Sequence, residues 1–250
     1  MKFWWLVLAG LCITAPVLAA EPNLRIDIEY RWLGWGDVQE HWRIERDSRG
    51  VTTRVDAALP MNRRDGQYVT LPAASVSAFE AAIDAAPVTM AVAVDEVARR
   101  LDRAAITRLD PTMTRSPAPS CGFAQRQAWA RKTLTEVELR KRVQQQLSPE
   151  SGLWTDDYPT LSVTVRRKGH PPVAFVSTSQ KALMLPWKQM PMGHSRSIDT
   201  GTLPAQWRPA LSDAVIALLP PGERSRARFH PGWLQERLRL HLEMDALACR

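Results

Sequence analysis

The chain has 250 residues, of which 45% are hydrophobic, and a formal net charge of +7. This length suffices for one large domain or two small ones with an apolar core, and the presence of ten Trp argues against a disordered chain. The basic residues are mostly Arg and are mixed with acidic residues along the chain, so the composition indicates no surface that reads nucleic-acid phosphates.

Residues 1–19 are predicted to be a cleaved secretory signal peptide. Lys2 supplies the positive charge, an apolar run follows from Phe3 to Ile13, and Val17-Leu18-Ala19 is typical of a cleavage site. We therefore expect a periplasmic or secreted mature protein, which has no transmembrane segment and does not meet nucleic acid.

A membrane anchor and a lipid anchor are two alternatives to a cleaved signal peptide. A membrane anchor needs roughly 20 apolar residues, whereas Thr14 and Pro16 interrupt the run early. A lipid attached to Cys12 would need a small residue directly before it, where the chain has Leu11. Both alternatives are disfavoured by these residues.

Residues 20–106 are predicted to form a subdomain that combines a β-meander with helices. Apolar and polar residues alternate from Leu24 to Trp32, which is the period of a strand with one buried face. Further strands are expected at 38–44 and 51–55, separated by a turn at 47–50, and such short turns imply antiparallel pairing.

Helices follow the meander. Pro72 suits the start of a helix that Pro87 ends, and its apolar residues recur at three- and four-residue spacings. Residues 88–94 are expected to form a buried strand, and a second helix is expected from about Asp95.

The Pro-rich segment 107–122 is predicted to be a linker to a C-terminal α+β subdomain at 123–250. Residues 123–147 lack Gly and Pro and are predicted to form one long central helix with two apolar stripes. A second small β element is expected at 161–177, followed by helices at 211–218 and from Pro231. The predicted fold class is therefore α+β with antiparallel strands.

Two cysteines remain after removal of the signal peptide, and we predict that Cys121 and Cys249 form a disulfide in an oxidising compartment. The bond would close a long loop between the middle of the chain and its end.

The sequence contains no Gly-x-Ser-x-Gly, His-Glu-x-x-His, Cys-x-x-Cys or phosphate-binding Gly-x-x-x-x-Gly-Lys pattern. No catalytic, cofactor-binding or metal-binding residue is therefore assigned. An active site assembled from distant residues stays open, with His194, Ser195 and Asp157 as its first candidates. His41 is expected to be a surface or half-buried residue.

The predicted function is an exported protein-binding module without enzymatic activity, such as an inhibitor or immunity protein. The alternatives are a hydrolase with a dispersed site and a basic protein that associates with an anionic envelope glycan or lipid. Aromatic and acidic residues around a turn are the expected partner contacts, together with one Trp that core packing would also explain. These residues are Trp154, Asp156, Asp157, Tyr158 and Trp187.

Overall fold

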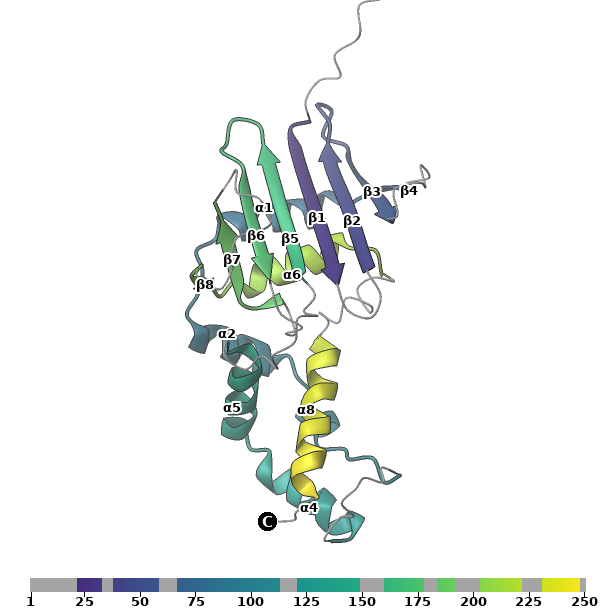
Figure 1. The fold of residues 1–250 in the computed structure, drawn as a ribbon, viewed down its shortest axis with the longest axis vertical. Helices are drawn as coiled ribbons and strands as arrows, with labels where there is room; N and C mark the ends of the chain where they lie inside the picture. Colours follow the sequence, from purple (N-terminus) through teal and green to yellow (C-terminus); the bar gives the residue numbers. More distant parts are fainter. Residues whose placement is uncertain are drawn as a thin grey trace, which may run out of the picture.

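The structure is a computed structural model that describes residues 22–32, 38–58, 67–112, 121–148, 160–177, 184–191, 203–221 and 231–247. Its eight strands form one antiparallel sheet in the order β4-β3-β2-β1-β5-β6-β7-β8, which confirms the predicted α+β class (Figure 1). The strands are β1 (Leu24–Trp32), β2 (Val38–Arg46), β3 (Thr52–Ala58), β4 (Gln67–Thr70), β5 (Thr160–Arg167), β6 (Val173–Ser177), β7 (Trp187–Met190) and β8 (Ala205–Gln206).

The central strand β1 joins the two halves of the chain. It pairs with β2, the next strand in sequence, and on its other side with β5, which follows more than 120 residues later. One sheet thus contains strands from both sides of the predicted linker. The strand β4 was not predicted from the sequence and forms one edge of this sheet.

The turn between β2 and β3 lies where the sequence predicted it. The Asp47 Oδ1 atom accepts hydrogen bonds from the backbone N–H groups of Arg49 and Val51, each at 2.9 Å. Gly50 has a φ of +83°, a left-handed conformation that glycine adopts without a steric penalty. This short turn fixes the register of the two strands.

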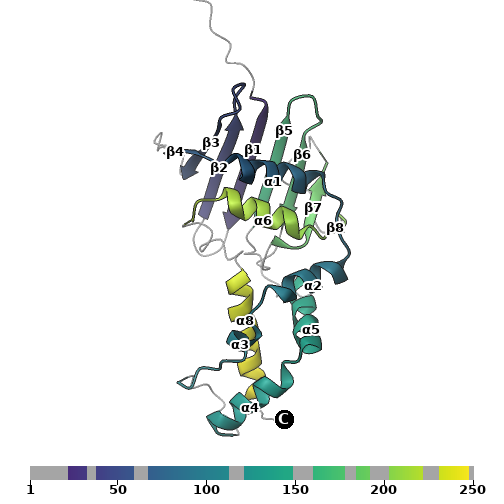
Figure 2. The ribbon, with the colours of Figure 1, turned by 180° about the vertical axis from the view of Figure 1, so that it is seen from behind.

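The helices divide into a layer on the sheet and a separate helical body. Both α1 and α6 lie across one face of the sheet, whereas the other helices gather beyond one end of it (Figures 1 and 2). The helices are α1 (Ala73–Asp84), α2 (Met90–Arg99), α3 (Arg103–Ile106), α4 (Phe123–Thr133), α5 (Glu136–Leu147), α6 (Pro209–Leu218) and α8 (Pro231–Ala246).

Alternate strand residues bury their side chains against the layer of α1 and α6. Leu24, Ile26 and Ile28 are fully buried, as the alternation of β1 predicted. At the layer's margins, Arg46 of β2 pairs with Glu80 of α1 at 2.7 Å, and Arg167 of β5 pairs with Asp84 at 2.7 Å. The helix layer is thus attached to this face by both apolar packing and ion pairs.

Two expected elements differ from the structure. The predicted long helix is two helices, because Thr135 interrupts it and its side chain accepts a hydrogen bond from the N–H of Glu138 at the start of α5. The strand expected at 88–94 is wrong. Only Val88 forms an isolated bridge, with Trp207, and the Thr89 side chain caps α2 by accepting a hydrogen bond from Val92 N–H.

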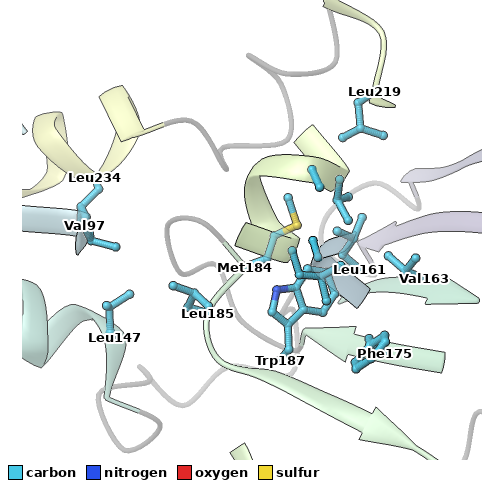
Figure 3. Packing of buried hydrophobic residues seen from close by; sticks show 14 of the residues in the cluster. Val97, Leu147, Leu161, Val163, Phe175, Met184, Leu185, Trp187, Leu219 and Leu234 are labelled. Atoms are coloured by element: carbon cyan, nitrogen blue, oxygen red, sulfur yellow. The ribbon is translucent and has the colours of Figure 1, made fainter. Parts of the chain in front are cut away.

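The core runs from the sheet into the helical body as one cluster of buried residues. Trp187 lies beside the sheet residue Phe175 in Figure 3, and its indole N–H donates to the Ser212 Oγ of α6 at 3.0 Å. In the same view, Leu185 lies between this group and Leu147 of α5. The apolar residues around β7 thus connect the two parts of the molecule.

Candidate functional site on the open sheet face

The second face of the sheet has no helix on it in the described part of the chain, and we call it the open face (Figure 1). Its centre is formed by the alternate residues of three adjacent strands that point away from the core. They surround a shallow hollow of about 260 Å³ and comprise Arg25, Asp27, Glu29, His41, Arg43, Ser162, Thr164 and Arg166.

Four side chains converge on the carboxylate of Asp27. The Arg25 Nε donates to Oδ2 at 2.9 Å, and the Arg43 Nε donates to Oδ1 at 3.0 Å. The Arg166 Nη1 donates to Oδ2 at 3.2 Å, while His41 Nε2 lies 3.2 Å from Oδ1. We call these five residues the Asp27 cluster.

The sheet register explains this convergence. Arg43 of β2 stands directly opposite Asp27 in the ladder, and Thr164 of β5 stands opposite on the other side. His41 and Arg166 occupy the diagonal positions, which long side chains can span. Strand pairing therefore places three guanidinium groups around one carboxylate.

The cluster carries an excess of positive charge. Burial of the Asp27 carboxyl raises its pKa, but hydrogen bonds from His41, Arg25 and Arg43 outweigh burial and hold the pKa well below its usual range. Asp27 is consequently ionised at any physiological pH. Its single negative charge faces three permanently charged arginines.

The carboxylate is covered, whereas two arginines reach the solvent. The Asp27 side chain is 16% exposed, and those of Arg43 and Arg166 are 41% and 53% exposed. Within the described ranges, the ion pairs of Arg43 and Arg166 with Asp27 use one nitrogen each. Both guanidinium groups therefore keep N–H donors that can bind a second acceptor without breaking the cluster.

His41 is half-buried, as predicted, and its contact with Asp27 resembles part of a catalytic triad. Ser162 lies on β5, however, and β1 separates this strand from β2. Because neighbouring strands are about 4.8 Å apart, the two side chains start roughly 10 Å from each other. The His41 Nε2 atom contacts Asp27 and, among the described residues, makes no hydrogen bond to Ser162.

The structure corrects one expected partner contact. Trp187 is 0% exposed and packs in the core, so its indole ring is not available to a partner. The other predicted contacts and site candidates lie outside the described residues: Trp154, Asp156, Asp157, Tyr158, His194 and Ser195, together with the signal peptide at 1–19.

Only one of the two cysteines of the predicted disulfide lies within the described residues. Cys121 lies two residues before the start of α4 and is disulfide-bonded. Cys249 lies outside the described residues, so the pairing of these two cysteines stays a prediction. Helix α4 contacts α8, whose described end is three residues before Cys249.

A second concave surface lies between α3 and α4 in the helical body. It encloses about 620 Å³ and is lined by Arg103, Arg108 and Arg131, among other residues. Its polar groups have structural roles: Asp102 caps α3, and Gln127 bonds to the backbone of Thr107 and Leu109. In the described structure no ion pair holds the three arginines in place, so this groove is less pre-organised than the Asp27 cluster.

Across the described ranges, no three His, Cys, Asp or Glu side chains gather as ligands for a metal ion. None of the helices in that part of the chain combines the length and the hydrophobicity needed to cross a membrane.

The fold and the site define an α+β protein with a half-covered antiparallel sheet and a charged open face. Comparisons with protein-family models, curated proteins and solved structures found no match to this chain. The geometry of the open face is therefore the main guide to the function of this chain.

Proposed function

We propose that this chain is an exported protein-binding module without catalytic activity, and that the open face is the surface that contacts its partner. The observation that carries the proposal is the Asp27 cluster, in which side chains of three strands are fixed by mutual ion pairs on a sheet face without a helix.

Exposure alone would not support this proposal, because antiparallel sheets commonly keep one face in water. The distinguishing feature is pre-organisation. Long arginine side chains normally lose conformational entropy when a partner orders them, at about 0.5–1.5 kcal/mol for each side chain. In the Asp27 cluster, bonds within the free protein already restrict Arg25, Arg43 and Arg166, which lowers this cost.

The arrangement favours binding over catalysis. The acid of the cluster is held ionised by arginines, so it is a poor proton acceptor at neutral pH. The histidine beside it makes no hydrogen bond to a Ser, Thr or Cys side chain among the described residues. Charge fixed on a rigid sheet is instead suited to orienting a partner and speeding its association.

The experiment first isolates the partner of the mature chain from extracts of the cells that produce it, and then compares two bulky substitutions. Thr164→Trp places an indole in the middle of the open face, beside Asp27. Ser77→Trp places the same group on the exposed side of α1, behind the sheet. We expect Thr164→Trp to weaken the affinity at least about tenfold and Ser77→Trp to change it less than about twofold.

Both variants must keep the thermal stability of the parent protein for this comparison to be valid. A partner that tolerates Thr164→Trp but is lost with Ser77→Trp would refute the open face as the contact surface, as would a partner that tolerates both.

A further inference from the structure

We propose that the Asp27 cluster recognises a single carboxylate side chain on an otherwise mostly neutral segment of the partner protein. This inference rests on the proposed function, since it names the chemistry that the open face binds. The inference goes beyond the proposed function by assigning the contact to the guanidinium N–H donors of Arg43 and Arg166 that Asp27 does not use.

The hydrogen bonds to Asp27 use only part of the donor capacity of the cluster's arginines. The two oxygens of Asp27 already accept bonds from Arg25, Arg43 and Arg166 and contact His41. Arg25 places a second nitrogen, Nη2, 3.4 Å from Oδ1, so it is the arginine most engaged with Asp27. Arg43 and Arg166 keep donors for one more acceptor.

The shape of the two guanidinium groups indicates which acceptor they can bind. Guanidinium groups are planar forks whose paired N–H groups match the two oxygens of a carboxylate. Arg43 and Arg166 approach Asp27 from opposite sides of β1, on β2 and β5. A second carboxylate above Asp27 would meet both forks and offset the excess charge of the cluster.

Two acidic side chains beside the cluster favour a protein segment with one carboxylate over a polyanion. Glu29 lies two residues from Asp27 on the same face, and Glu45 stands opposite Arg25 in the ladder. A highly charged glycan or lipid surface would bring negative groups against both carboxylates, which costs free energy. A single carboxylate on a mostly neutral segment fits between them.

The test uses a blocked peptide of sequence Gly-Ser-Glu-Ser-Gly, its counterpart with Gln in place of Glu, and a sulfated disaccharide as three separate probes. Each is titrated into the full mature protein while the Nε–H signals of its arginines are followed by NMR. We expect the Glu peptide alone to cause saturable shifts at Arg43 and Arg166, without comparable shifts at the exposed Arg49.

Variants with equal changes in net charge provide the control. The double variant Arg43→Gln, Arg166→Gln should weaken peptide binding at least about tenfold, whereas Arg49→Gln, Lys168→Gln should leave it within about twofold. Arg43→Lys keeps the charge and the fold but loses the fork, so it should also weaken binding. These variants separate carboxylate recognition from a general effect of charge.

Equal losses in both double variants, an equal response to the Gln peptide, or stronger shifts with the sulfated disaccharide would overturn the proposal. Failure of the carboxylate assignment can also be distinguished from failure of the proposed function. If Thr164→Trp abolishes partner binding while the Glu peptide causes no shift, the contact surface stands and the carboxylate assignment falls. If the peptide binds but Thr164→Trp leaves the partner bound, the proposed function falls.

Discussion

Asp27 is the residue on which the open face depends. Its carboxylate neutralises part of the charge of three arginines that would otherwise repel one another at close range. The same carboxylate holds their side chains over the sheet, so that one residue sets both the charge and the geometry of the surface.

The first prediction concerns the replacement Asp27→Asn. The amide cannot accept all the bonds that the carboxylate accepts, so the free energy of unfolding at neutral pH should fall by about 1–3 kcal/mol. Asp95→Asn is the matched control, because its pair with Arg140 is exposed and should contribute less than about 1 kcal/mol. Urea denaturation of the two variants and the parent measures both differences.

The pH dependence of the Asp27→Asn difference has a definite sign. The pKa of Asp27 is lower in the folded protein than the value of about 3.9 for an unfolded chain, so its contribution is fully present above that value. The contribution is lost as pH falls toward the folded pKa. The gap between parent and variant should therefore be constant from about pH 5 to 8 and narrow below about pH 4. A gap that widens in acid would contradict this account.

At the scale of elements, the break between α4 and α5 shows what a local signal can specify. The sequence Thr135-Glu136-Val137-Glu138 has the spacing of a helix start, with a capping Thr and a Glu three residues later. The absence of Gly and Pro from residues 123–147 favoured one long helix instead. The two apolar stripes of the expected long helix belong in part to two separate helices, and Val137 is exposed.

The second prediction tests this helix start. Thr135→Ala removes the side-chain oxygen that accepts the Glu138 N–H at 3.2 Å, and it should lower the free energy of unfolding by about 1 kcal/mol. Gln145→Ala lies at an exposed position within α5 and should change it by less than about 0.5 kcal/mol. Thermal unfolding of both variants makes the comparison. A Thr135→Ala protein as stable as the parent would show that the cap is dispensable.

The positions of the strands were predicted more reliably than the identity of the strands that pair with them. The alternation in β1 identifies its buried residues because side chains on a strand point to opposite faces. Alternation does not state which strand lies beside β1, and the pairing with β5 spans all the helices from α1 to α5. The Asp27 cluster was missed for this reason. Arg25, Asp27 and Arg166 become a site only when the register of three strands is known.

The strand expected at 88–94 does not form because a competing local signal starts a helix there. Val88, Val92 and Val94 suggested a buried strand because branched residues favour sheets. Thr89 has the stronger influence, since its side chain satisfies a free N–H group at the start of α2. In the folded chain Val94 faces the core and Val92 is exposed, which is the pattern of a helix.

On the scale of the whole molecule, one sheet contains strands from both halves of the chain, and the helical body is attached beyond the sheet's end (Figure 1). Arg100 of α2 pairs with Asp213 of α6 at 2.7 Å, which links the helical body to the helix layer. Within the body, Arg142 of α5 pairs with Asp245 of α8 at 2.8 Å. The last described helix is therefore held by contacts distant in sequence.

The third prediction concerns the Cys121–Cys249 disulfide. A bond that closes a loop of this length should contribute up to about 5 kcal/mol by reducing the entropy of the unfolded chain. Peptide mapping of the unreduced mature protein should recover the two cysteines linked, and Cys121→Ser should lower the urea midpoint. Two free thiols in the unfolded, unreduced protein would show that the pairing is wrong.

The most direct test of the central claim locates the partner on one side of the sheet. A photo-crosslinking amino acid is placed at Ser162 on the open face in one variant and at the exposed Ala81 of α1 in another. The account predicts that the partner crosslinks to position 162 and not to position 81. Crosslinking at position 81 with none at position 162 would contradict it.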